Sequence, residues 1–137
     1  MKNKSEIILR ATNPSQYDLD GVSWEPTIGL ESPMRVFIWK YLKPYSLNWQ
    51  NKKILDIGAG SGWLLEEARK LGASKFTGIE PSKKNYEASK KLFPQIEMVN
   101  LPFEKFVPNE KYDVIVSILA LSHILDIEMV FKKYLTW

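Results

Sequence analysis

The segment from Ile54 to Leu64, ILDIGAGSGWL, constrains the fold more than any other part of the chain. It begins with aliphatic residues, as a buried parallel strand does, and Gly58, Gly60 and Gly62 then allow tight turns and a close approach of the backbone to a ligand. Apolar residues next recur at helical spacing until Gly72, a residue type common just past a helix end. The segment therefore predicts a strand, a ligand-binding loop and a helix in direct succession.

The spacing of the glycines distinguishes two kinds of nucleotide site. Dinucleotide-binding loops follow the pattern G-x-G-x-x-G, but here the third glycine comes one residue early and Trp63 stands where that pattern needs glycine. An acid, Asp56, precedes the first glycine by two residues. This order, acid-x-G-x-G-x-G, resembles the first motif of the class I methyltransferases that use S-adenosylmethionine. A tight strand-to-helix turn in some other α/β protein is the alternative interpretation.

The resemblance implies a role for each part of this loop. Asp56 would orient the methionine ammonium group of the cofactor, directly or through water, while the loop amides would receive its carboxylate. Ser117, in a later strand, is a further candidate for cofactor binding. The candidates in the loop itself are Asp56, Gly58, Ala59, Gly60, Ser61 and Gly62.

A second acid follows the next predicted strand, Lys75 to Ile79. Glu80 lies 24 residues after Asp56 (80 − 56), with one helix between them, and its carboxylate can accept hydrogen bonds from both hydroxyls of a ribose. In the methyltransferase resemblance Glu80 is the ribose ligand, and Pro81 packs beside the adenine. Ser82 is a suitable cap for the next helix. An acid at a strand end is often merely solvated, so the spacing from Asp56 carries this assignment.

A third strand is predicted from Ile96 to Val99, after a helix from about Lys83 to Phe93. In the family the resemblance indicates, a polar residue after this strand faces the adenine amino group and an adjacent apolar residue covers the ring. Asn100 and Leu101 match those positions, although the family more often has an acid at the first. A turn that merely closes the strand is the other interpretation.

The fourth predicted strand runs from Tyr112 to Leu119 and is almost continuously apolar, which is typical of a strand buried on both faces in the middle of a sheet. The segment after it, Ala120 to Asp126, resembles the corresponding segment of small-molecule methyltransferases. It contains His123, the chain's one histidine and a weak candidate for a general base. In the resembling families this histidine more often shapes the pocket, so no catalytic residue is assigned.

Residues 1–50 are predicted to form an N-terminal cap, and residues 51–137 a partial Rossmann-like domain that binds S-adenosylmethionine. An amphipathic helix is expected over residues 33–45, with an apolar stripe packed against the sheet. Tyr17 and Trp24 fall where such methyltransferases often fold a segment across the pocket, or else they pack under a surface loop. The predicted stripe consists of Met34, Phe37, Ile38, Tyr41, Leu42 and Tyr45.

Composition excludes several functions. The chain has no cysteine, so it contains no disulfide, no thiolate metal site and no cysteine nucleophile. Metal dependence of the catechol type is not expected, because Ser117 occupies the region where those enzymes place an aspartate ligand. The net charge of +3 is spread along the chain and forms no basic stripe, which disfavours nucleic acid as a partner. No apolar run reaches membrane-spanning length, and the expected location is the cytoplasm.

The predicted fold class is α/β, a Rossmann-like doubly wound sheet of the class I methyltransferase type that is truncated after the fourth strand and one helix, about Ile127 to Thr136. The resemblance implies a sheet order of 3-2-1-4-5-7-6 in the complete fold. Without the later strands, Val114 to Leu119 would be an exposed sheet edge, which a second copy or a partner would cover. A naturally minimal binding domain is the other possibility.

The function implied is methyl transfer from S-adenosylmethionine to a small-molecule acceptor, with this chain carrying mainly the cofactor-binding part. Binding is therefore expected to outlast catalysis. Three alternatives remain at this point: a non-catalytic cofactor-binding or assembly module, an RNA methyltransferase, and an NAD-type oxidoreductase, which the glycine spacing disfavours.

Overall fold

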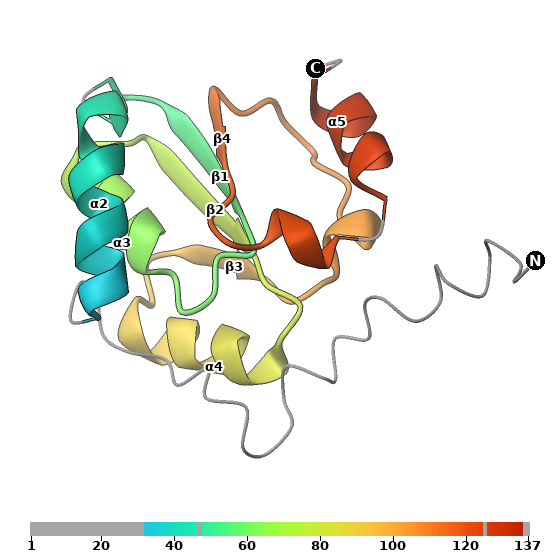
Figure 1. The fold of residues 1–137 in the computed structure, drawn as a ribbon, viewed down its shortest axis with the longest axis horizontal. Coiled ribbons are helices and arrows are strands. Elements are labelled where there is room, and N and C mark those ends of the chain that lie inside the picture. The colour runs from blue at the N-terminus through green and yellow to red at the C-terminus, as the bar shows by residue number, and fades with distance from the viewer. Residues whose placement is uncertain (1–31, 47, 125, 136–137) are drawn as a thin grey trace, which may run out of the picture.

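The computed structural model describes residues 32–46, 48–124 and 126–135. Four parallel strands form one sheet in the order β3-β2-β1-β4, which confirms the first four positions of the predicted order. The strands are β1 (Lys53–Ile57), β2 (Lys75–Ile79), β3 (Glu97–Val99) and β4 (Val114–Val116). The helices are α2 (Pro33–Ser46), α3 (Trp63–Lys70), α4 (Lys83–Leu92) and α5 (Ile127–Leu135), with single 3₁₀ turns η2 (Phe103–Lys105) and η3 (Leu121–His123). Figure 1 shows their arrangement.

Alternate residues of β1 enter two separate cores, as the period of two in a strand requires. Ile54 packs on the side of the sheet covered by α2 and α3. Leu55 and Ile57 pack on the other side, against Phe103 and Phe106 near η2. Because both faces are covered, the buried part of the strand after Lys53 is apolar except for Asp56, and it positions the glycine loop at its end.

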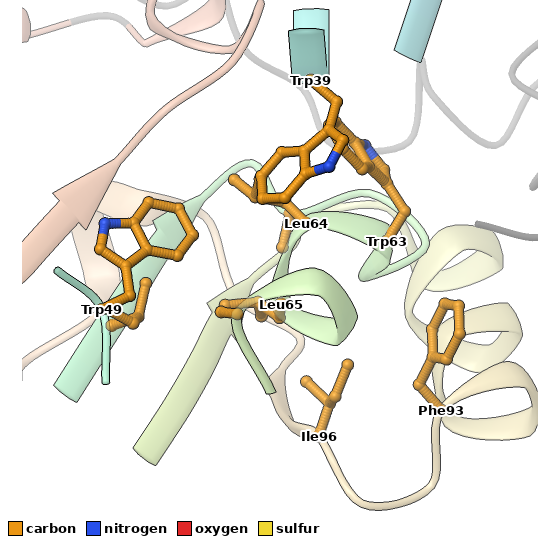
Figure 2. Packing of buried hydrophobic residues seen from close by; sticks show 10 residues of the cluster. Trp39, Trp49, Trp63, Leu64, Leu65, Phe93 and Ile96 are labelled. Carbon is orange, nitrogen blue, oxygen red and sulfur yellow. The ribbon is translucent and has the colours of Figure 1, made fainter. Parts of the chain in front are cut away.

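A cluster of three tryptophans joins α2 to the rest of the fold. The ring of Trp39 on α2 lies 6.4 Å from that of Trp49 and 6.4 Å from that of Trp63, measured between ring centroids, and it meets the ring of Trp63 edge to face. Figure 2 shows Trp39 close to Trp63, above Leu64 of α3. The cluster is buried, so α2 is part of the same core as α3.

The prediction of which face of α2 is buried was wrong in part. Ile38 and Leu42 do pack against the core, together with Trp39. The other four residues of the predicted stripe are exposed by 59% to 81% of their surface, because the large ring of Trp39 turns its own side of the helix inward. These four residues are Met34, Phe37, Tyr41 and Tyr45.

The fourth strand is shorter and less buried than predicted. It pairs with β1 over only three residues, and among the described strands β1 is its one neighbour, so β4 forms the edge of the sheet. Ile115 is 40% exposed there. Leu119, which was predicted to end the strand, instead has a φ of 58°, and this left-handed conformation cannot continue a strand. The expected sheet edge is therefore present.

The other elements agree with the predicted ranges to within one or two residues, including the cap of α4, where Ser82 Oγ accepts a hydrogen bond from the Asn85 amide at 3.1 Å. Tyr17 and Trp24 lie outside the described residues. Within the described part of the chain, no helix is both long and apolar enough to cross a membrane.

Gly78, the fourth residue of β2, packs closely against the glycine loop and the start of α3. A Cβ atom added at this residue would lie 2.8 Å from the Cβ of Ala59 and 2.8 Å from Leu65 Cδ1. We expect Gly78→Ala to lower the free energy of unfolding by about 2 kcal/mol, because Ala59 cannot move without the loop. Urea unfolding measures this loss. Gly72→Ala is the control. Gly72 has a left-handed φ of 80°, but an added Cβ would have no contact shorter than 3.5 Å, so this substitution should lower the free energy of unfolding by about 1 kcal/mol.

Candidate functional site

A cavity of about 280 Å³ lies at the carboxyl ends of β1, β2 and β4. This is where open α/β sheets bind ligands, because the chain reverses its direction of progress through the sheet between β1 and β4. Three walls enclose the cavity. The first wall is formed by the carboxyl ends of β1 and β2 and the loops after them, with Asp56, Ile57, Gly58, Ala59, Gly60, Ile79, Glu80 and Pro81. The second wall is the start of α2, with Met34, Arg35 and Ile38. The third wall consists of Pro102, Phe103, Glu104, Ile118, Leu119, Ala120, His123 and Ile124.

The glycine loop depends on backbone conformations that side chains disfavour. Gly58, Gly60 and Gly62 have φ angles of 77°, 56° and 84°, so each of the three alternate glycines is in the left-handed region. At Gly58 there is also no room, since an added Cβ would lie 2.2 Å from the Cβ of Ala120. The alternating glycines therefore let the loop turn sharply and let the segment after β4 close against it.

Most of the loop amides already have acceptors within the protein, contrary to the expectation that they are available to a carboxylate. The N–H groups of Gly58 and Ala59 both donate to the Ile79 carbonyl, at 2.9 and 3.0 Å. The Gly62 N–H donates to the Ala59 carbonyl at 2.9 Å, and the Gly60 N–H donates to Glu80 Oε2 at 2.7 Å. The bonds to Ile79 and Glu80 fix the loop to the carboxyl end of β2, and the bond between Gly62 and Ala59 closes the loop on itself.

Asp56 is a buried acid facing the cavity from the end of β1. It is 3% exposed, and its carboxylate makes no hydrogen bond or ion pair with any of the residues that the structure describes. Burial, with a smaller contribution from the negative charge of Glu80, raises the pKa of Asp56 from 3.8 to about 7. An isolated carboxyl group in this position favours a cationic ligand, which would compensate its charge.

Glu80 is held in one orientation by two backbone amides. Its Oε2 accepts from the Gly60 N–H at 2.7 Å, and its Oε1 accepts from the Ser82 N–H at 2.9 Å. The residue is 6% exposed and lines the cavity. Because a carboxylate has about four acceptor positions, the fixed group can also receive hydroxyl groups of a ligand.

Arg35 is a site residue that sequence reasoning missed. Its guanidinium group lines the cavity, donates a hydrogen bond to Ser61 Oγ at 3.1 Å and lies 5.8 Å from the centroid of the Trp63 ring. Partial burial lowers the pKa of Arg35. The contact joins α2 to the glycine loop across 26 residues of sequence, so no local pattern could have indicated it. It places a cation beside the loop.

Five of the predicted site residues are absent from the cavity lining, and all of them except Leu101 contact residues of the walls. Ser61 orients Arg35, and Gly62 lies against Phe93 and Ile96 on the side of α4. The Asn100 side chain donates to the carbonyls of Glu80 and Pro81, at 2.9 and 3.1 Å. Ser117 Oγ donates to the Ile57 carbonyl at 3.0 Å, and Leu101 is 37% exposed.

The third wall is mostly apolar. His123 and Glu104 are its two titratable residues, and both are partly buried. Leu119, with its left-handed backbone, is 69% exposed at the rim of the cavity. Such a wall suits an apolar surface of a second molecule, placed opposite the acids of β1 and β2.

Comparisons with known proteins point in the same direction. A ubiquinone biosynthesis O-methyltransferase from Bradyrhizobium diazoefficiens is 31% identical over 85 residues, which are 59% of this chain and 33% of that protein. A tRNA U34 carboxymethyltransferase from Shewanella oneidensis is 31% identical over 91 residues, which are 62% of this chain and 28% of that protein. The chain thus spans about a third of the length of these curated relatives.

A solved structure of an S-adenosylmethionine dependent methyltransferase from Mesorhizobium loti superposes with a TM-score of 0.64 and 26% identity, over 69% of this chain and 45% of that one. The family described as "Methyltransferase domain" matches residues 33–137, from the first residue of α2 to the end of the chain. With its four-stranded sheet and glycine loop, the chain belongs to this methyltransferase family.

Proposed function

We propose that the chain binds S-adenosylmethionine in the cavity and provides the cofactor-binding part of an enzyme that methylates a small molecule. The observation that carries this proposal is the buried Asp56 carboxylate, which faces the cavity without a partner among the described residues. A ligand with a positive charge at that point, a ribose and a carboxylate fits the three groups around the loop. The chain matches only about a third of its curated relatives. The methyl transfer reaction is therefore proposed for the complete enzyme, of which this chain is the cofactor-binding part.

Each described group would hold a different part of the cofactor. Asp56 would bind the methionine ammonium group, and Glu80 the ribose hydroxyls. Arg35 would bind the methionine carboxylate, because it is the cation that lines the cavity beside the loop and the loop amides have other acceptors. The bound cofactor supplies a methyl group on a positively charged sulfur. The protein then contributes position and electrostatics, while the acceptor gains the methyl group and loses a proton.

A small-molecule acceptor is supported by the apolar third wall and by the distribution of charge. Lys53 and Lys75 both pair with Glu110. Lys70 pairs with Glu67, and Lys132 with Glu128. Each of these four lysines faces an acid, whereas RNA binding needs basic groups gathered on one surface.

RNA remains the second candidate acceptor because one relative is a tRNA enzyme. Retention of the chain on immobilised RNA, lost steeply as salt is raised from about 50 to 200 mM, would favour it. No retention at the lower salt concentration would favour the small molecule.

Titration calorimetry with S-adenosylhomocysteine tests the cofactor assignment, with NAD as the comparison ligand. We expect saturable binding of S-adenosylhomocysteine and no heat from NAD. A folded, monodisperse sample that binds neither ligand would contradict the proposal and would favour an assembly module. Binding of NAD alone would favour an oxidoreductase.

The role of Arg35 makes a separate prediction that a second ligand can isolate. 5′-Methylthioadenosine has the adenosine part of the cofactor but no ammonium or carboxylate group. We expect Arg35→Met to weaken binding of S-adenosylhomocysteine by about 30-fold and to leave binding of methylthioadenosine within about twofold, because a charge-assisted pair is worth about 2 kcal/mol. Equal losses for both ligands in calorimetry would instead mean that Arg35 only supports the loop.

A further inference from the structure

One side of α2 carries an apolar stripe that begins at Met34, in the lining of the cavity, and that none of the described elements covers. Met34, Phe37, Tyr41 and Tyr45 recur every three or four residues, so they share one side of the helix. Their exposed fractions are 59%, 62%, 59% and 81%. The rings of Phe37 and Tyr41 lie 4.8 Å apart, which makes this part of the surface continuous. An exposed aromatic stripe of this kind is typical of an interaction surface.

The sequence just before α2 has a pattern that matches this surface. From residue 22 to residue 30 apolar residues alternate with small or polar ones. An extended segment with this alternation has one apolar face, which needs an apolar surface to cover it. The residues on that face are Val22, Trp24, Pro26, Ile28 and Leu30.

The charges of the two segments are complementary. Residues 13–31 contain four acids and no lysine or arginine, and one of these acids, Glu25, lies within residues 22–30. In contrast, α2 contains Arg35, Lys40 and Lys43 and no acid. Both lysines are exposed, but Lys43 comes nine positions after Met34 and so lies on the opposite side of the helix from the stripe, which makes the attraction a long-range one. Attraction between the two would favour this pairing over the pairing of two copies of the basic helix.

The connection is short and the lengths are compatible. Only Glu31 and Ser32 separate Leu30 from Pro33, the first residue of α2. Nine extended residues span about 30 Å, whereas the 14 residues of α2 span about 21 Å. A segment that turns back at residues 31 and 32 can therefore run along the whole stripe, and the short connection makes its local concentration high.

We propose that residues 22–30 fold back as an extended segment on the stripe of α2, with their apolar face on Met34, Phe37, Tyr41 and Tyr45. The stripe is then an intramolecular docking surface for the chain's own N-terminal segment. In this arrangement Leu30 would meet Met34 and Ile28 would meet Phe37, because two extended residues advance by a distance similar to one turn of the helix. This inference does not depend on the bound cofactor or on the acceptor.

Hydrogen exchange of the 137-residue chain tests the docking. We expect the amides of residues 22–30 to exchange about tenfold faster in the double variant Phe37→Ser, Tyr41→Ser than in the unchanged chain. Val36→Ser is the matched control, because Val36 is a 51% exposed apolar residue of the same helix that lies outside the stripe. Since all three side chains are exposed, α2 and the sheet should keep their own protection, which the same experiment reports.

A pair of introduced cysteines gives a second measurement. The chain has no cysteine of its own, so the introduced pair can form the only disulfide within one chain. The pair Ile28→Cys, Phe37→Cys should form a disulfide within one chain at least about tenfold faster than the control pair Ile28→Cys, Val36→Cys. Equal rates, or exchange at residues 22–30 that is as fast in the unchanged chain as in the stripe variant, would overturn the proposal. A dimer that Phe37→Ser, Tyr41→Ser dissociates in sedimentation would overturn it too, in favour of a second copy on the stripe.

Discussion

Replacing Glu80 with glutamine lowers the affinity of the chain for S-adenosylhomocysteine by about 100-fold, or about 2.7 kcal/mol. The carboxylate is fixed by the amides of Gly60 and Ser82, so it meets the ribose hydroxyls as a preformed, charged acceptor. Glutamine keeps one oxygen but replaces the other with a donor, which faces an amide N–H or a hydroxyl. The variant therefore loses both the charge and one of the two acceptors.

Calorimetry of two ligands distinguishes this role from that of Arg35. Glu80→Gln should weaken the binding of S-adenosylhomocysteine and of methylthioadenosine to the same extent, because both ligands contain the ribose. Glu87→Gln, which makes the same change of charge on the exposed side of α4, should alter neither affinity by more than about twofold. An unchanged affinity of Glu80→Gln for both ligands would show that the ribose lies elsewhere. Thermal unfolding without ligand establishes that the loop survives the substitution.

The glycine loop and the position of Glu80 could be predicted because their requirements are local. A left-handed φ at three alternate residues needs glycine, and the chain has glycine at all three. An acid one residue after β2 must lie beside the loop after β1, since the two strands are parallel neighbours in register from Lys53 with Lys75 to Ile57 with Ile79. The sequence pattern therefore predicted both the left-handed backbone of the loop and the position of Glu80 beside it.

The face of α2 could not be predicted in the same way, because its apolar residues fall on two overlapping stripes. The pattern containing Phe37 and Tyr41 has more aromatic area than the one containing Ile38 and Leu42. What decides between them is the contact of Trp39 with Trp49 and Trp63, which come from outside the helix. Periodicity describes one element at a time, so it cannot register such a contact.

The role of Arg35 and the length of β4 were beyond sequence reasoning for related reasons. The partners of Arg35, Ser61 and Trp63, lie on a different element, and an arginine in a first helical turn is otherwise common. For β4, the apolar run of Tyr112 to Leu119 describes a strand with neighbours on both sides. With pairing to β1 alone, the described strand shortens to three residues. The apolar pattern of a segment indicates that it can form a strand, whereas the length of that strand depends on the neighbouring strands with which it pairs.

Asp56 should make the stability of the chain fall as the pH rises from about 4 to about 7. Its pKa is about 7 in the folded chain and 3.8 ordinarily, so between these values the unfolded chain has released the proton that the folded chain still holds. Unfolding then becomes more favourable with each step in pH. The pKa difference corresponds to on the order of 4 kcal/mol in full, reached above pH 7.

Asp56→Asn removes this dependence while keeping the size of the side chain, so the comparison isolates one group among all that titrate. In urea unfolding at pH 8 we expect the Asp56→Asn variant to be several kcal/mol more stable than the unchanged chain, whereas at pH 4 the two should be similar. A constant difference between the two chains from pH 4 to pH 8 would contradict the raised pKa of Asp56.

The same carboxyl group should couple cofactor binding to the release of a proton. An ammonium group beside Asp56 stabilises the ionised acid and lowers its pKa, so at pH 6.5 the binding of S-adenosylhomocysteine should release about half a proton or more. Calorimetry in buffers of different ionisation enthalpy measures that number directly. Methylthioadenosine, which lacks the ammonium group, should release almost none, and neither ligand should do so with Asp56→Asn. Equal proton release by both ligands would show that the ammonium group binds away from Asp56. The Asp56 carboxylate, which has no partner among the described residues, would then require a different cationic group as its ligand.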